Sequence, residues 1–281
     1  MINKIISLRT VATLATVVLL GGMLLSASAA KKTTPKVMTA PDFAYPQTVE
    51  KNAAANLSAS VAHGDWPAAV EAMIQSVTAA NIVSHDNAVS GLAKIDSIAN
   101  IAPKEWKPAF YLIEAEVYNT IYNSQRWKAD DRQLSLDSVP SNPYEWSRDI
   151  FADKILNICN RIIENGENDA RPLKDWNKFI ENTECSYSLG MNVNEFLFQQ
   201  CFTLLNVYSD PTRDVIPFFT NSNNAVTPSQ KCAELRDICI DRLIAETSSL
   251  NQSLLLAKAL NDKAEIIPYS LRMKFLLSAY D

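Results

Sequence analysis

Apolar residues recur along most of this chain at the spacing of an α-helix. Val49, Ala53, Leu57 and Val61 lie four residues apart, which places them on one face of a helix. Gly64 follows this stretch, and glycine often ends helices because it accepts the left-handed backbone conformation. The pattern therefore predicts a helix from about residue 48 that ends at Gly64.

A second helix is predicted directly after this glycine. Asp65 is a favourable N-cap, and Pro67 falls in the first turn, where a missing N–H costs nothing. The apolar positions that follow form one stripe: Val70, Met73, Ile74 and Val77. The two helices would make an αα-hairpin, the building block of helical repeat arrays.

The same periodicity continues to the end of the chain. Two strings resemble capping boxes, Asn142 to Glu145 and Thr227 to Gln230. We expect further helices over 86–99, 103–121, 142–166, 194–208, 227–243, 250–260 and 269–280, a short helix near 176–180 and a short extended piece at 215–219. The sequence thus predicts an all-α fold of irregular antiparallel hairpins, stacked as a curved array similar to tetratricopeptide repeats.

The first thirty residues have the features of a signal peptide. Lys4 and Arg9 precede an apolar run from Val11 to Leu25, and small residues follow at 26–30. The run is short for a membrane-spanning helix, which needs about 20 apolar residues. We expect a cleaved signal peptide (1–30), an extended tether (31–44) and a helical domain (45–281) with a possible sub-boundary near 124–142. The protein would then be exported to the periplasm, the cell envelope or the medium, with no membrane span after cleavage.

Composition narrows the possible functions. The chain has six glycines, two of them in the predicted signal peptide, so phosphate-cradling loops and tight β-hairpins are disfavoured. The formal charge is −5, and loss of Lys4 and Arg9 brings it to −7. Since no basic stripe stands out, nucleic acid is not an expected partner.

The five cysteines are an odd number for an exported chain. Four of them lie on apolar stripes and are predicted to be buried thiols. Cys185 lies in a polar stretch instead, and two alternatives stay open for it: a disulfide to a cysteine such as Cys201 or Cys159, or a free thiol.

No catalytic, cofactor or metal site is predicted. The two histidines, His63 and His85, have no serine or cysteine nearby in a nucleophile elbow. Cys232 and Cys239 are two helical turns apart, too far to share one metal ion. The acidic pairs Glu114/Glu116, Asp130/Asp131 and Glu164/Glu167 are interpreted as solvated charges on helix faces and loops.

Most aromatic side chains are expected in the core. An interaction surface is nevertheless possible around Trp66, Tyr122, Arg126 and Trp127, because Trp127 follows a predicted helix and has polar neighbours. Aromatic and arginine side chains are enriched in protein–protein interfaces.

Four segments together resemble the start of large bacterial alpha-2-macroglobulin-like proteins. These are Pro41 to Lys51 (PDFAYPQTVEK), Gly64 to Trp66 (GDW), Ile121 to Trp127 (IYNSQRW) and Glu145 to Arg148 (EWSR). The resemblance implies a helical region that precedes the macroglobulin domains of an envelope or secreted protein associated with protease trapping. The thioester string of that family, Cys-x-Glu-Gln, does not occur here, so the resemblance assigns no functional residue to this chain.

The sequence therefore favours a non-catalytic interaction module whose partner is another protein or downstream domains of the same polypeptide. One alternative is a free-standing exported repeat protein that binds a peptide or glycan, and a less favoured one is a hydrolase with an unrecognised carboxylate pair. If further domains follow, the last helix should expose apolar residues, among them Leu271, Phe275, Leu276 and Tyr280.

Overall fold

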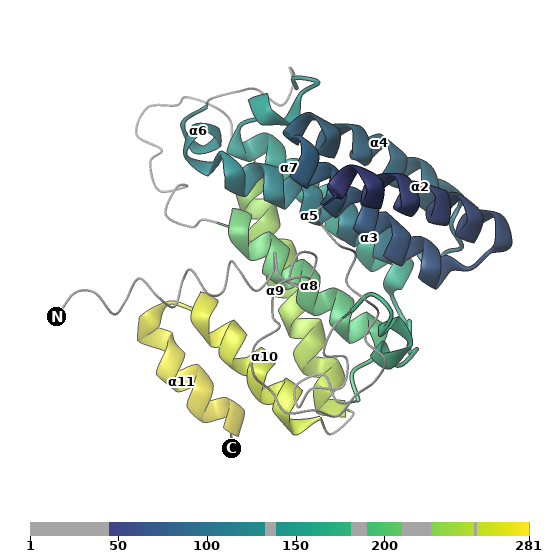
Figure 1. Ribbon diagram of the computed structural model, residues 1–281. Helices are drawn as coiled ribbons and strands as arrows, with labels where there is room; N and C mark the ends of the chain where they lie inside the picture. The colour runs from purple at the N-terminus through teal and green to yellow at the C-terminus, as the bar shows by residue number, and fades with distance from the viewer. Residues whose placement is uncertain (1–44, 133–138, 181–189, 210–225, 250–251, 281) are drawn as a thin grey trace. The chain divides into compact units, whose positions relative to one another are not determined.

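The computed structural model describes residues 45–132, 139–180, 190–209, 226–249 and 252–280 (Figure 1). Within these ranges the chain forms α-helices, two 3-10 helices and connecting turns, with one isolated β-bridge between Pro172 and Asn192 and no sheet. Successive helices pack as antiparallel neighbours. The predicted all-α class is confirmed.

The chain divides into two compact units. The described part of the first unit consists of residues 45–102 and 176–180. That of the second consists of residues 103–132, 139–175, 190–209, 226–249 and 252–280. The chain passes between the units at Ala102–Pro103 and again at Asp175–Trp176, and the sub-boundary near 124–142 stays a prediction.

The first unit contains α2 (Pro46–His63), α3 (Trp66–Val83) and α4 (His85–Ile101), with α3 packed against both neighbours. As predicted, α2 ends at Gly64, which has φ = 71°. Asp65 caps α3, since its carboxylate accepts a hydrogen bond from the Ala68 N–H at 3.2 Å. The first predicted hairpin is confirmed, turn included.

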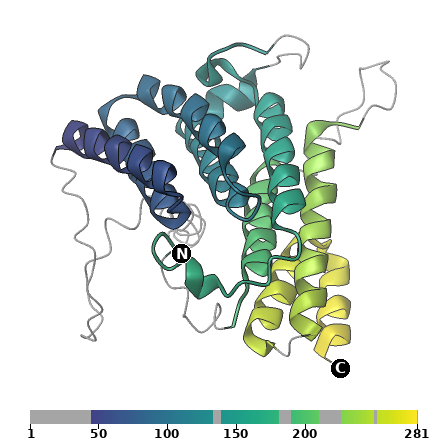
Figure 2. The same ribbon diagram turned by 90° about the vertical axis from the view of Figure 1, so that its right-hand side faces the viewer.

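The second unit contains most of the helices. They are α5 (Lys107–Ser124), α6 (Arg126–Asp131), η2 (Pro143–Glu145), α7 (Arg148–Gly166), α8 (Val193–Tyr208), α9 (Pro228–Ser249), α10 (Ser253–Ile266) and α11 (Tyr269–Tyr280); η3 (Leu173–Trp176) ends at the boundary with the first unit. α5 packs on α7, and α7, α8 and α9 pack on one another. α10 packs on α9, and α11 lies beside α10 (Figures 1 and 2).

A cluster of aromatic rings fills the centre of the second unit. Trp146 stacks on Tyr118 with ring centroids 5.2 Å apart and meets Phe151 edge-on at 5.2 Å. Tyr122 contacts Phe151 and Tyr208 at 5.4 and 4.9 Å. Such contacts contribute about 0.5–1.5 kcal/mol per pair beyond the burial of apolar area, so the cluster fastens α5, α7 and α8 together.

Two predicted helix starts are wrong. α5 begins at Lys107 rather than at Pro103, because residues 103–106 close a turn in which the Trp106 N–H donates to the Pro103 carbonyl at 2.9 Å. Asn142 does cap a helical turn, accepting from the Tyr144 N–H at 3.0 Å, but that turn is η2. The following α-helix, α7, begins only at Arg148.

The capping box predicted at Thr227 is confirmed. The Gln230 N–H donates to the Thr227 hydroxyl at 3.2 Å, and the Thr227 N–H donates to the Gln230 side chain at 2.9 Å. Another capping box, which was not predicted, begins α8, where Asn192 and Glu195 exchange two hydrogen bonds of 2.8 Å. Both boxes satisfy backbone N–H groups that the first turn of a helix leaves unpaired.

Candidate functional site

Tyr122, one of the predicted surface residues, lies in the core. Its side chain is fully buried, and its hydroxyl donates to Asp130 Oδ1 at 2.9 Å. Burial raises the pKa of Tyr122 to about 12. Its place in the aromatic cluster shows that this tyrosine anchors α6 to the core, and the prediction of a surface role for its ring is corrected.

Arg126 and Trp127, by contrast, face solvent on α6. The Trp127 side chain is 68% exposed, and the Lys128 ammonium lies 5.1 Å from its ring centroid. Arg126 reaches Asp130 at 3.8 Å and lies over the Tyr122 ring. α6 therefore presents an exposed tryptophan that is flanked in the sequence by Arg126 and Lys128, and tryptophan and arginine are enriched at protein interfaces.

The remaining predicted site residues lie elsewhere. Trp66 is half-buried at the start of α3 and belongs to the first compact unit, whereas Trp127 belongs to the second. His63 is the last residue of α2 and is exposed. Cys185 lies outside the residues that the structure describes, as does the extended piece predicted at 215–219.

The acidic pair Glu114/Glu116 is not solvated, so that interpretation is wrong for these two residues. Glu114 is 2% exposed and forms ion pairs with two cations of α7, Lys154 at 2.9 Å and Arg161 at 3.4 Å. Each cation also covers a tyrosine ring of α5. Because both positive charges belong to α7, the Glu114 carboxylate links α5 to α7 through ion pairs. Glu164 and Glu167 are exposed, as predicted.

Glu116 occupies a different environment. Its side chain is 7% exposed, and burial raises its pKa from 4.5 to about 7, opposed by a hydrogen bond with Asn119. Asn119 also accepts the Tyr208 hydroxyl at 3.4 Å. A carboxyl group with a pKa near neutrality has the proton affinity of a general acid. The side chain is enclosed in the core, where Asn119 is its hydrogen-bond partner.

The four cysteines that the structure describes are buried and free, as predicted: Cys159, Cys201, Cys232 and Cys239. They lie on α7, α8 and α9, where these helices meet. Burial raises the pKa of Cys232 to about 12. The pKa of Cys239 is raised well above its usual value, mainly by its hydrogen bond with Cys201 and also by burial. Thiols in this state are poor nucleophiles, because the thiolate is the reactive form.

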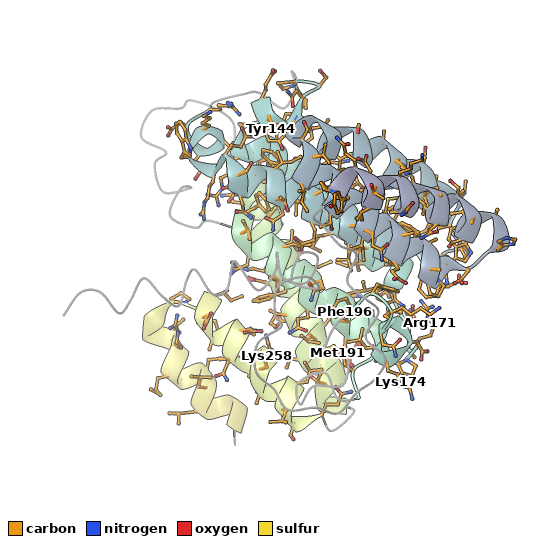
Figure 3. All side chains as sticks on the ribbon, in the orientation of Figure 1. Tyr144, Arg171, Lys174, Met191, Phe196 and Lys258 are labelled. Atoms are coloured by element: carbon orange, nitrogen blue, oxygen red, sulfur yellow. The ribbon has the colours of Figure 1, made fainter. Side chains whose placement is uncertain are left out.

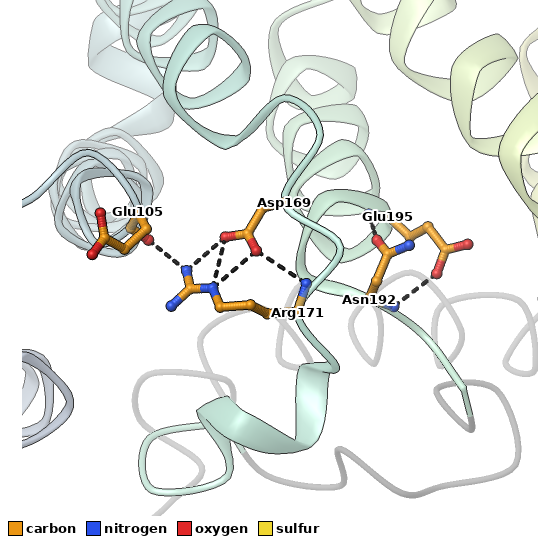
Figure 4. A network of polar contacts seen from close by, with 5 residues as sticks. All are labelled: Glu105, Asp169, Arg171, Asn192 and Glu195. Atoms are coloured by element: carbon orange, nitrogen blue, oxygen red, sulfur yellow. Dashed lines mark hydrogen bonds and ion pairs between the residues drawn. The ribbon is translucent and has the colours of Figure 1, made fainter.

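A polar network holds the segment between α7 and α8 (Figure 4). The Arg171 guanidinium donates to the Asp169 carboxylate at 2.6–3.1 Å and to the Glu105 carbonyl at 2.7 Å. It also lies 4.8 Å from the Trp106 ring centroid. Arg171 thereby ties this segment to the residues before α5. The capping box that begins α8 lies beside it in the same view.

The same segment pairs with the residues that lead into α8. The Leu173 N–H donates to the Met191 carbonyl at 2.9 Å, and the Val193 N–H donates to the Arg171 carbonyl at 2.9 Å. Figure 3 labels Arg171 and Met191 on the two pieces of chain that meet here. Glu195, fully buried, ends this network, with a pKa raised by burial. These contacts fix the backbone of the two pieces of chain relative to each other.

α11 offers the largest concentration of exposed apolar residues in the described chain. Leu271, Met273 and Leu277 are 54%, 67% and 63% exposed, whereas Phe275 and Leu276 are half-buried. None of the described side chains of α11 is buried. Four residues were predicted to be exposed here. Leu271 is exposed, whereas Phe275 and Leu276 are partly covered. The side chain of Tyr280 lies outside the described set. Met273 was missed, although its helical spacing from Leu277 was a usable signal.

Among the described residues, no group of three His, Cys, Asp or Glu side chains has an arrangement that holds a metal ion. None of the described helices combines the length and apolarity needed to cross a membrane.

The comparisons with known proteins do not assign the chain to a class of protein. No protein-family model, no curated protein and no solved structure matches the chain.

Proposed function

We propose that this chain is an exported α-helical interaction module that binds another protein, or further domains of its own polypeptide, through α11. The observation that carries the proposal is the exposure of Leu271, Met273 and Leu277 within seven residues of one helix. A water-facing cluster of this kind is unfavourable unless a partner covers it, since apolar area removed from water contributes about 25 cal/mol per Å².

The arrangement of the second unit supports the same function. α8 to α11 follow one another along the chain, and each packs on its predecessor, as hairpins do in a tetratricopeptide-like array. In such arrays the next helix covers the open face of the last one. We therefore propose that the α11 partner continues this stacking.

The resemblance of the four sequence segments to alpha-2-macroglobulin-like proteins extends the proposal. On that basis the module belongs to the helical region of an envelope or secreted protein that traps proteases, and its role is to hold the macroglobulin domains or an envelope partner. The buried placement of Glu114, Glu116 and the thiols is consistent with a binding role.

The experiment is to determine the size and assembly of the native protein. Antibodies raised against residues 45–132 would be applied to fractionated cells after denaturing and native electrophoresis. We expect either a polypeptide well above 31.2 kDa or a native complex that dissociates when Leu271, Met273 and Leu277 are changed to Ser. Ile238→Ser, at another exposed apolar residue of the same unit, is the matched control. A monomeric polypeptide at or slightly below 31.2 kDa would rule out the proposal.

A further inference from the structure

The exposed side of α11 is defined by its contacts with α10. The Arg272 guanidinium donates to the Glu265 carbonyl at the end of α10 at 3.1 Å, and Lys263 of α10 lies 5.7 Å from the Phe275 ring centroid. Together with Leu276, which is also half-buried, these residues mark the side of α11 that is already occupied.

The opposite side is open over about 160° of the helix circumference, at 3.6 residues per turn. It carries four exposed residues, Leu271, Met273, Lys274 and Leu277, which we call the open face. Exposure along the helix alternates in step with this division: every described residue on the open face is exposed, and every described residue on the α10 side is half-buried.

The spacing on the open face fits a helix as its occupant. Met273 and Leu277 are four residues apart, and Leu271 and Lys274 are three apart, as are Lys274 and Leu277. These are the ridges through which one helix packs against another. A partner helix would insert its own apolar residues between them.

The charge on α11 favours one kind of partner helix over others. Its charged residues are Arg272 and Lys274, with no Asp or Glu between Tyr269 and Tyr280. Arg272 is engaged at the end of α10, whereas Lys274 projects from the open face. A second copy of the chain would bring two such cationic helices together, because a twofold contact pairs the same surface with itself. Self-association is therefore disfavoured, and carboxylates on the partner are favoured.

We propose that the open face binds an amphipathic helix of another protein or domain, with apolar residues at helical spacing flanked by Asp or Glu. This inference rests on the proposed function and names its partner by chemistry. The partner's leucine-like side chains cover Leu271, Met273 and Leu277, and its carboxylate pairs with Lys274 at the edge of the contact.

Site-specific cross-linking in the cell that naturally produces the protein tests this assignment. Met273 of the full chain is replaced by p-benzoylphenylalanine, and the cross-linked peptide is sequenced after irradiation. Ile238, exposed on α9, carries the same probe as a control. We expect a cross-link from position 273 and not from 238. It should lead to a segment with helical apolar periodicity and net negative charge.

Charge substitutions at Lys274 test the electrostatic part. Lys274→Glu should lower the cross-link yield from position 273 about fivefold, the effect of roughly 1 kcal/mol, and Lys274→Arg should preserve it. A cross-link to a basic or uncharged segment, to the same helix of a second copy, or to lipid would overturn the inference. The first of these leaves the interaction function standing, whereas the absence of any cross-link from position 273 would sink the function as well.

Discussion

α5 and α11 belong to the same unit and are both rich in apolar residues, yet their environments are opposite. Nearly all of α5 is buried, including the carboxylates of Glu114 and Glu116. α11 buries none of its described side chains. The difference lies in neighbours: α5 packs against α7 and α8, whereas α11 packs chiefly beside α10. A helix that is enclosed by other helices can bury charged side chains, whereas a helix at the margin leaves leucine side chains exposed to water.

The largest expected effect comes from removing a ring from α5. Phe110 is fully buried, so Phe110→Ala should lower the free energy of unfolding by about 3–5 kcal/mol, through lost burial and the cavity left behind. Urea denaturation followed by circular dichroism measures this. A loss under about 1 kcal/mol would show that α5 is less tightly enclosed than its burial indicates.

Titration of Glu116 tests the buried charge of α5. Its pKa is raised from 4.5 to about 7 in the folded state, so the folded protein binds this proton more tightly than the unfolded chain. The stabilisation is complete below pH 4.5 and is lost as pH rises towards 7, by roughly 3 kcal/mol. Glu116→Gln should remove this contribution to the pH dependence and stabilise the protein at pH 8.

The matched control for Glu116 is Glu234→Gln on the exposed face of α9. This variant should leave the stability profile between pH 4.5 and 8 unchanged within about 0.5 kcal/mol. An equal response of both variants would indicate that Glu116 is hydrated in solution.

A methyl group added beside α5 should have a smaller effect. A Cβ at Gly166 would collide with Leu197 Cδ1 and lie 3.5 Å from Pro108 Cγ, so the Leu197 side chain must move. We expect Gly166→Ala to cost about 1–3 kcal/mol in thermal or urea unfolding. Gly91→Ala in α4 has its nearest neighbour at 3.8 Å and should be neutral or stabilising by up to about 1 kcal/mol.

The smallest effects are expected on α11, and they separate its two sides. Leu271→Gln and Leu277→Gln should each change the free energy of unfolding by less than about 0.5 kcal/mol. Phe275→Ala, on the side covered by α10, should cost about 1 kcal/mol or more. Destabilisation by the two Gln variants equal to that of Phe275→Ala would mean that the open face is already covered within the chain.

Much of this fold follows from local signals in the sequence. Gly64 and Asp65 turn one helix into the next through backbone and capping preferences that need no distant partner, and Thr227 with Gln230 does the same for α9. The failure at Asn142 shows the limit. Its cap forms, but residues 146 and 147 then leave the helical path, with Trp146 stacked on Tyr118 and its Nε1 donating to the Pro140 carbonyl at 2.7 Å.

The surfaces were harder to predict than the helices. Tyr122 and Trp127 belong to one short polar-looking string, yet one is fully buried and the other is 68% exposed. Glu114 and Glu116 resembled solvated charges, yet both are buried, and Glu114 pairs with Lys154 and Arg161 of α7. In each case a residue far along the chain decides the environment, and helical periodicity carries no information about that residue. The missed cap at Asn192 is different, because the capping-box residues Asn192 and Glu195 can be recognised from the sequence alone.

The four buried thiols also provide a built-in probe of how often the second unit opens. Cys159, Cys201, Cys232 and Cys239 are inaccessible in the folded second unit, so a thiol-modifying reagent can reach them only when α7, α8 and α9 separate. Under conditions where reclosing outpaces labelling, the modification rate reports the free energy of that opening in unmodified protein. The variants in the second unit can therefore be ranked by mass spectrometry, from the rate at which their own cysteines are modified.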